Sequence, residues 1–341
     1  MIQQQILFPQ RDLTIVQITN SDAKRKTDEL QALRKLVLSN EEMYPAIREW
    51  FDQKVTHGLI SGERSAFLGM SDGRPVASAI VKRGEKSKFC HLQVVNHLQE
   101  QHLGELFFVL MTLQIRQVAC EVHFTLPEGL WEHRRGFFQS FGFDEARKSA
   151  TQYRTVEQEL VCSARFDELW SAALQKLPKL VSSFSSGGHA LDNSIVLSLR
   201  PQWAAAIIQG RKRVEIRRVF SARWEGHRAS LYATNPIKSL VGEARIGRVV
   251  EGTPAEIWAI YGADIGCDRA SFDSYTGSAS RVFALELTDV RPFARQVGVD
   301  ELAAMLGEKP RAPQSYSSHS NTSVWGRCVS LAALLNNHEI R

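Results

Sequence analysis

The chain has 341 residues, of which 43% are hydrophobic and 23% are charged, and its formal net charge is +5. This composition is that of a globular protein, and the length exceeds one typical hydrophobic core, so we expect two domains. The sequence has no long apolar run, and residues 1–13 lack both a basic region and an extended apolar region. These features argue against a membrane span and against a secretory signal.

The cysteines also exclude some classes of protein. There are five, an odd number, and no two are spaced as C-x-x-C. This pattern predicts reduced thiols in a cytoplasmic protein, and it argues against a zinc cluster and a disulfide framework. We therefore expect no metal site.

The positive charge is concentrated in one segment. Residues 1–180 hold 23 basic and 22 acidic side chains, whereas residues 200–248 hold eleven basic and three acidic ones. Nine of these eleven are arginines, whose planar guanidinium group suits bidentate partners such as phosphate. An anionic partner is therefore expected in the second half of the chain.

A candidate linker separates the two halves. Residues 181–193 collect Ser, Gly, Asp and Asn between two regions of regular patterning, which is typical of a linker. We predict a first domain at 1–180, a linker at 181–193 and a second domain at 194–341.

The first domain is predicted to mix helices and strands, on the basis of hydrophobic periodicity and turn residues. The expected elements, in chain order, are an amphipathic helix carrying Leu30, Leu33 and Val37, a second amphipathic helix opening at Pro45, strands at 66–70 and 76–81 around an Asp72-Gly73 turn, a strand at 88–95, a helix at 104–117, a strand at 118–126, a short helix at 129–140 and a β-rich segment at 151–161.

A glycine stands where a strand passes into a helix. Gly104 would let backbone amides at the start of this helix approach an anion closely, so a pyrophosphate would fit there. The alternative is a glycine at an ordinary helix start.

The order of these elements resembles the GNAT acetyltransferase family over residues 13–160. Two motifs carry the resemblance: the turn at 101–106, which matches Gln/Arg-x-x-Gly-x-Gly/Ala except at its last position, and the later Phe137-Phe138 with Gly142-Phe143. The resemblance implies acetyl-CoA as cofactor. It also implies a set of cofactor-binding residues, in which Val94 and Val95 pair with the pantetheine arm and the backbone amides of Gln101, His102, Leu103, Gly104, Glu105 and Leu106 hold the pyrophosphate.

The catalytic base is left open among three residues. Glu121 and His123 follow on the strand after the turn helix, and His91 lies on the strand before it. For each of them a purely structural role is the alternative.

The second domain opens with a strand, a helix that starts at Pro201 and ends at Gly210, and a further strand. On that strand Glu215 and Arg217 are expected on one face, with Lys212 beside them and Glu215 paired to a neighbouring cation. The alternative is a solvated strand face.

This region resembles the ASCH domain of the PUA-like superfamily over residues 194–320. The resemblance rests on Gly210-x-Lys212-x-x-Glu215-x-Arg217, on the segments 231–246 and 282–290, and on Pro313-Gln314-Ser315-Tyr316. It implies a small β-barrel whose motif residues line an RNA or nucleotide site. The expected nucleic-acid-binding residues are Lys212, Glu215, Arg217, Arg218 and Tyr232. Of these, Lys212, Arg217 and Arg218 would contact phosphates. Tyr232, Trp224 or Trp203 could stack a base, with core packing as the alternative for Trp203.

The predicted fold class is α+β in two domains, a GNAT-like mixed sheet with flanking helices followed by a PUA-like (ASCH) β-barrel with helices. The predicted function is an acetyl-CoA-dependent N-acetyltransferase with an RNA- or nucleotide-binding ASCH domain, the acceptor being tRNA or a modified nucleoside. One alternative is a non-catalytic RNA-binding regulator with a degenerate acetyltransferase fold. Another is an ASCH-type N4-acetylcytidine amidohydrolase that uses Lys212, although Glu215 replaces the threonine of such enzymes.

Overall fold

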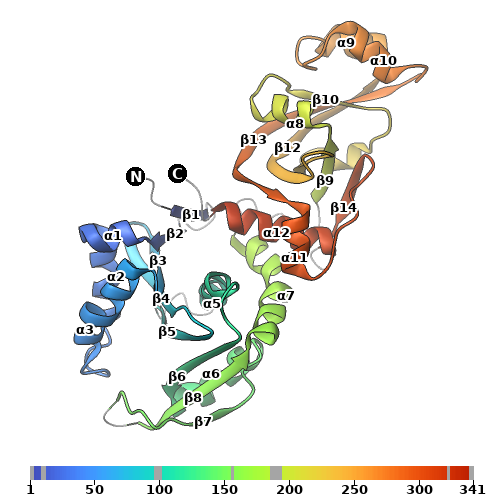
Figure 1. Ribbon diagram of the computed structural model, residues 1–341. Coiled ribbons are helices and arrows are strands. Elements are labelled where there is room, and N and C mark those ends of the chain that lie inside the picture. Colours follow the sequence, from blue (N-terminus) through green and yellow to red (C-terminus); the bar gives the residue numbers. More distant parts are fainter. Residues whose placement is uncertain are drawn as a thin grey trace. The chain divides into compact units, whose positions relative to one another are not determined.

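The computed structural model describes residues 4–8, 13–95, 102–154, 157–184, 194–320 and 323–337. The chain divides into two compact units, Met1–Gly188 with Asn337–Arg341 and His189–Asn336, each with its own sheet (Figure 1). None of the helices described is both long enough and apolar enough to cross a membrane. All five cysteines lie in the described residues and are free thiols.

The first unit contains an eight-stranded mixed sheet. Neighbouring strands of this sheet are antiparallel, except β5 and β6, which are parallel. The strand order is β1 (Gln4–Phe8), β2 (Leu13–Ile18), β3 (Arg64–Ser71), β4 (Arg74–Lys82), β5 (Lys86–Val94), β6 (Glu121–Pro127), β8 (Glu159–Arg165) and β7 (Ala146–Lys148).

Helices cover both faces of this sheet. The helices of the first unit are α1 (Asn20–Arg25), α2 (Asp28–Leu38), α3 (Ile47–Glu49), the π-helix η1 (Trp50–Val55), α4 (Thr56–Ser61), α5 (Leu103–Ile115), α6 (Glu128–Gln139) and α7 (Phe166–Phe184). Side chains of α1 to α4 form one core with Ile80 of β4. On the opposite face, Phe108 of α5 contacts Phe89 of β5 and Phe124 of β6.

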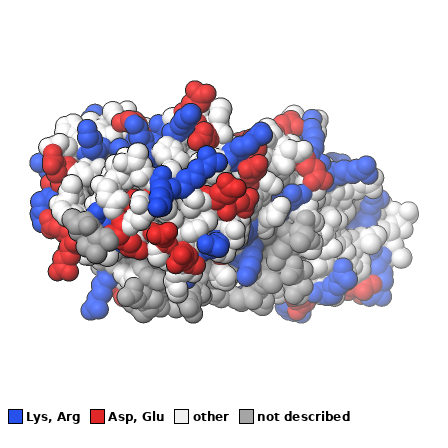
Figure 2. All heavy atoms as spheres, turned by 90° about the horizontal axis from the view of Figure 1, so that it is seen from below, with Lys and Arg blue, Asp and Glu red and all other residues white. Residues whose placement is uncertain are grey.

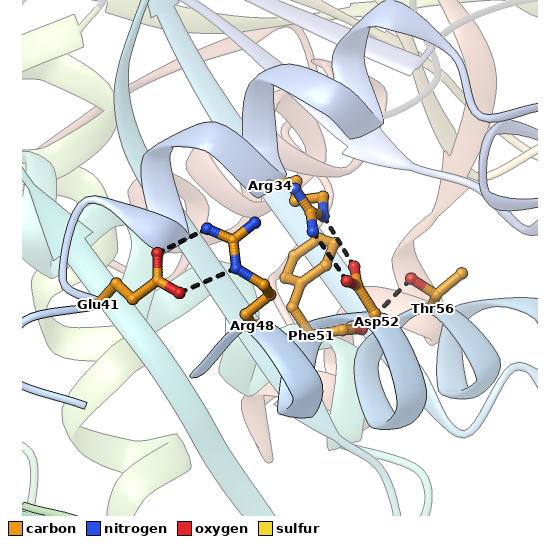
Figure 3. Close-up of polar contacts among 6 residues, drawn as sticks. All are labelled: Arg34, Glu41, Arg48, Phe51, Asp52 and Thr56. Atoms are coloured by element: carbon orange, nitrogen blue, oxygen red, sulfur yellow. Dashed lines mark hydrogen bonds and ion pairs between the residues drawn. The ribbon is translucent and has the colours of Figure 1, made fainter. Parts of the chain in front are cut away.

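The segment from α3 to α4 is held in place by two bidentate ion pairs. Arg34 of α2 binds Asp52 at 2.7 and 2.8 Å, and Arg48 binds Glu41 at 2.9 and 2.7 Å (Figure 3). Asp52 lies in the π-helix η1, which makes i→i+5 hydrogen bonds. Because Glu41 and Arg48 lie on either side of residue 44, their pair fixes the loop between α2 and α3.

The second unit contains a six-stranded sheet around a separate core. Its order is β10 (Val214–Arg217), β13 (Val282–Gly298), β12 (Ser239–Gly252), β11 (Arg228–Ala233), β9 (Ser194–Leu199) and β14 (Tyr316–His319). The helices are α8 (Pro201–Ile208), the short η4 (Ala222–Trp224), α9 (Pro254–Tyr261), α10 (Arg269–Thr276), α11 (Val299–Leu306) and α12 (Val324–Asn337). The long strands β12 and β13 shift register three times, and such bulges bend a sheet and increase its twist.

The predicted fold class, α+β in two domains, is confirmed: a mixed sheet with flanking helices is followed by a separate six-stranded sheet with helices. The β-rich segment expected at 151–161 is wrong in its bounds, because the strands are β7 and β8 with a loop between them. Helix α7 continues to Phe184, so the first residues of the predicted linker are helical. The division between the units falls after Gly188, inside the predicted linker, whose residues 185–193 lie outside the described residues.

Candidate functional site

The parallel strands β5 and β6 separate after a short contact. They pair only at Lys86 with Glu121, Ser87 with Val122 and Lys88 with His123, although both strands continue beyond that point. The separation begins next to a bulge in β5, where Cys90 is inserted between the residues that face Ile80 and Val81. Because a bulge bends its strand, β5 turns away from β6, and the facing backbone edges open toward the carboxyl ends of both strands.

The predicted cofactor-binding turn leads into α5 beside this opening. The first N–H groups of a helix stay outside its own hydrogen bonds, and these belong to Leu103, Gly104 and Glu105. The His102 ring nitrogen Nδ1 lies 2.6 Å from Glu105, and Lys176 of α7 lies 3.2 Å from the same carboxylate. Val94 and Val95 end β5, whereas Gln101 lies outside the described residues.

Leu106 of the turn motif and Phe138 of the late motif are both buried. Leu106 is 1% exposed and packs in the core, so its side chain does not cover the start of α5. Phe138 is 8% exposed and packs against Phe124 and Trp131. A phenyl ring has no proton to donate, so Phe138 cannot act as a general acid.

The sheet face opposite α5 carries the candidate bases. Lys88 pairs with His123, and paired residues of neighbouring strands share a face. Side chains alternate along a strand, so Glu121 lies on that face as well. His91 shares it too, because it pairs with Ile80. The structure thus brings the three sequence-predicted candidates to one face of β5 and β6.

The two histidines on this face favour the neutral form. Burial lowers the pKa of His91 to about 4, and its Nε2 lies 2.9 Å from the Ser78 hydroxyl. Burial, followed by the charge of Lys88, also lowers the pKa of His123. A general base works best when its pKa lies near the operating pH, so the low pKa of His91 makes it a weak base at neutral pH.

Sequence reasoning missed three residues at the end of this face. Glu159 begins β8 opposite Pro127 and is 1% exposed. The guanidinium carbon of Arg154 lies 4.5 Å from the ring centroid of Tyr44. Only the register of β6 and β8 places Glu159 on the face of the candidate bases, and no local sequence pattern signals that pairing.

In the second unit, the ASCH-type motif forms a buried ion-pair network. Lys212, Glu215 and Arg217 are 5%, 7% and 7% exposed. The Glu215 carboxylate lies 3.2 Å from Lys212 Nζ and 3.2 Å from Arg217 Nε. The expected pairing of Glu215 is confirmed, and the alternative of a solvated strand face is wrong for these residues.

Lys212 is surrounded by acceptors. Its Nζ donates to the carbonyl oxygens of Val214 and Ile265 at 2.9 and 2.8 Å, in addition to the contact with Glu215. An ammonium group has three N–H donors, so each one has an acceptor. Lys212 Nζ also lies 5.4 Å from the ring centroid of Trp203, which is half-buried on α8.

The remaining predicted contacts differ in exposure. Arg218 is exposed and its guanidinium carbon lies 5.6 Å from the Tyr275 ring centroid. Tyr232 is 3% exposed and packs against Trp325, and Trp224 is buried in the core. Of the proposed stacking residues, Trp203 is therefore the one with a partly accessible ring.

Possible metal ligands do not cluster. Among the described residues, no group of three or more His, Cys, Asp or Glu side chains could hold a metal ion.

The surface charges are mixed on the face drawn in Figure 2, where Lys and Arg side chains are interspersed with Asp and Glu.

Known protein families and solved structures resemble parts of the chain. A family described as a domain of unknown function (DUF365) matches residues 194–309. An ASCH domain-containing ribonuclease of Zymomonas mobilis is 33% identical over 107 residues, which are 31% of this chain and 72% of that protein. The crystal structure of ASCH from Zymomonas mobilis is 29% identical, covering 41% of this chain and 96% of that one with a TM-score of 0.37.

A putative acetyltransferase of the GNAT family from Desulfovibrio desulfuricans is 14% identical, covering 45% of this chain and 99% of that one with a TM-score of 0.34. The fold is α+β, with a mixed eight-stranded sheet in the first unit and a curled six-stranded sheet in the second. The chain belongs to the family of ASCH domain-containing proteins.

Proposed function

We propose that the first unit is an acyl-CoA-dependent N-acyltransferase that uses acetyl-CoA, and that the second unit binds RNA or a nucleotide. The observation that supports the transferase is the parallel pair β5 and β6, whose pairing stops after Lys88 and His123. Extended ligands bind by adding to open strand edges, and the pantetheine arm of CoA carries amide groups that suit such an edge.

The start of α5 fits the phosphates of the same cofactor. The N-terminus of a helix attracts anions through its free N–H groups and its dipole. Lys176 lies close by and would add positive charge, whereas the Glu105 carboxylate, which contacts both Lys176 and His102, opposes it. When a pyrophosphate binds, we expect Lys176 to leave its ion pair with Glu105 and to contact the phosphates instead.

Calorimetric titration of the full chain with acetyl-CoA tests this half of the proposal. We expect saturable binding of one acetyl-CoA per chain, and weaker binding of ADP, which lacks the pantetheine arm. Absence of acetyl-CoA binding would rule the transferase out. Binding without turnover over a panel of RNAs and amines would instead support the non-catalytic regulator.

The second unit supplies the charge for binding RNA. Arg211 and Arg213 flank Lys212 in the sequence, Arg218 follows Arg217, and all three of Arg211, Arg213 and Arg218 are exposed. Phosphate contacts release counterions, so affinity falls as salt rises. We expect that changing one of these arginines to Ala weakens RNA binding and reduces the salt slope by about one.

Cleavage of RNA is a second candidate function for the second unit. The 33% identical relative is named a ribonuclease, and the buried network offers a carboxylate between two cations. Incubating end-labelled RNA with the full chain and with Glu215→Gln tests it. Cleavage that the substitution abolishes supports this function, and intact RNA rejects it.

Hydrolysis of N4-acetylcytidine is less favoured, because the three N–H donors of Lys212 already have acceptors.

A further inference from the structure

Glu159 is a buried carboxylate without a bonded partner at one of its oxygens. The residue is 1% exposed, and its Oε1 has no hydrogen-bond partner among the described residues. Leaving a buried acceptor unsatisfied costs free energy, and more when the group is charged. A buried polar atom without a partner is therefore a candidate for contact with a ligand.

A buried donor without a partner belongs to the same cluster. Arg154 Nε has no hydrogen-bond partner within the described part of the chain, while its NH1 donates to Glu157 at 3.1 Å. The positive charge of Arg154 lowers the pKa of Glu159, against the larger effect of burial, which raises it. The cluster therefore contains one buried acceptor and one buried donor that lack partners, from side chains that the chain brings close together.

The surrounding loop holds these groups in position. Gln152 donates to the carbonyl oxygen of Arg154 at 3.0 Å and accepts from the backbone N–H of Glu159 at 3.4 Å. Glu157 accepts from the backbone N–H of Gly129 at 2.8 Å. The Tyr44 ring, on the loop between α2 and α3, packs against the Arg154 guanidinium. The Glu41–Arg48 ion pair spans the same loop (Figure 3). The two unpartnered polar atoms are therefore preorganised before any ligand binds.

We propose that Glu159 and Arg154 bind the amine-bearing edge of the acyl acceptor, and that this acceptor is a nucleobase with an exocyclic amino group, such as cytosine. This inference rests on the proposed acyltransferase function. Cytosine presents an N4 amino donor beside an N3 acceptor. These complement the unpartnered carboxylate oxygen of Glu159 and the unpartnered N–H of Arg154. An alkylammonium ion offers donors only, so it would satisfy Glu159 and leave Arg154 Nε without a partner.

The position suits the transfer step. Glu159 pairs with Pro127 at the carboxyl end of β6 and shares a sheet face with His123, so it stands at the open end of the gap between β5 and β6. The amino nitrogen attacks the thioester carbonyl, the C–N bond forms and the C–S bond breaks. The proton lost by the amino group passes to the Glu159 carboxylate and ends on the CoA sulfur, which leaves the reaction balanced.

The test uses the full chain, its Glu159→Gln variant and Glu145→Gln as the matched control, because Glu145 is exposed. Acetyl-CoA is supplied with cytidine, with oligocytidylate or with spermidine, and acetylated products are measured by mass spectrometry. We expect acetylation of the cytosine compounds, a loss of about 10²–10⁴-fold in kcat/KM for Glu159→Gln, and no change for Glu145→Gln. Acetylation of spermidine alone, or equal rates in Glu159→Gln and the native chain, would overturn the proposal.

Two binding measurements separate this inference from the proposed function. Calorimetry with acetyl-CoA alone should give the same affinity for the native chain and Glu159→Gln. Thermal stabilisation by cytidine alone should be present in the native chain and absent in the variant. If acetyl-CoA does not bind, the transferase fails, while cytidine binding that depends on Glu159 still supports the base site. If cytidine stabilises both proteins equally, the base site fails even where acetyl-CoA binds.

Discussion

Arg217 of β10 donates from NH2 to the carbonyl oxygen of Ser198 in β9 at 2.6 Å. Its NH1 lies 3.2 Å from the hydroxyl and 3.3 Å from the carbonyl oxygen of Ser315, just before β14. In the strand order β10 is one edge of the sheet, and β9 and β14 end the other side. A single buried guanidinium therefore joins the two sides of the curled sheet, with Glu215 balancing its charge.

Removing that guanidinium should destabilise the second unit. We expect Arg217→Met to lower the free energy of unfolding by about 3–5 kcal/mol, because it leaves buried carbonyl groups and the Glu215 carboxylate with fewer partners. Urea unfolding monitored by hydrogen exchange in β9 and β10 measures the loss. Arg218→Met, at an exposed neighbour, is the control; equal stability of the two variants would contradict a clamping role for Arg217.

Gly266 should not tolerate a side chain. Its φ is +75°, and a Cβ would lie 2.9 Å from the Cβ of Lys212, so a side chain there meets both backbone strain and a clash. Gly210 has a similar φ of +71°, but a Cβ at that position would have no neighbouring atom within 4 Å. We expect Gly266→Ala to lower the melting temperature clearly more than Gly210→Ala. Equal shifts would mean that the approach to Lys212 is not tight.

Stability of the first unit should fall in mild acid because of His91. Burial lowers its folded pKa from 6.5 to about 4, so between these values the unfolded chain binds more protons, and unfolding becomes easier as the pH falls from 6.5 toward 4. The loss is at most ~3 kcal/mol. The test measures the urea unfolding midpoint at pH 7 and pH 4.5 for the native chain, for His91→Asn and for His57→Asn, whose side chain is exposed. Only His91→Asn should reduce the fall in the midpoint between the two pH values.

Glu159→Gln should stabilise the first unit at neutral pH. Burial raises the pKa of this carboxyl above its ordinary value of 4.5, and the charge of Glu157 adds to it against Arg154 and Lys88. The folded state therefore binds the proton more tightly, and the native chain loses stability as the pH rises through the raised pKa. We expect a higher melting temperature for the variant at pH 7.5 and no gain at pH 4. A lower melting temperature would show that the carboxylate has a structural partner.

A bulky side chain at Gly104 should block the cofactor without unfolding the protein. A Cβ there would meet nothing closer than Phe137 at 4.0 Å, so Gly104→Ala is accommodated. Gly104→Trp places an indole over the start of α5, and we expect acetyl-CoA affinity to fall by at least about tenfold while the melting temperature stays near that of Gly104→Ala. Unchanged affinity in Gly104→Trp would place the phosphates elsewhere.

The sequence determined the elements whose signals are local. The spacing of Leu30, Leu33 and Val37 predicted α2, the Asp72-Gly73 turn predicted the β3–β4 hairpin, and Pro201 and Gly210 predicted the bounds of α8 to within two residues. Helix α7 was missed even though Leu169, Ala173, Leu177 and Leu180 lie buried along its length at helical spacing. The charge pattern also placed the basic segment, because composition does not depend on how the chain folds.

Only the tertiary structure decided which of these residues act together. Glu159 shares a sheet face with His123 because β8 pairs antiparallel with β6, and a shift of one residue in that register would turn its side chain to the other face. Arg217 reaches Ser198 and Ser315 only because the sheet curls. Lys212 and Glu215 appeared from alternation alone to belong to an open strand face, and the packing of residues 264–266 against them makes them buried. Contacts between residues far apart in sequence depend on register and curvature, which no local pattern encodes.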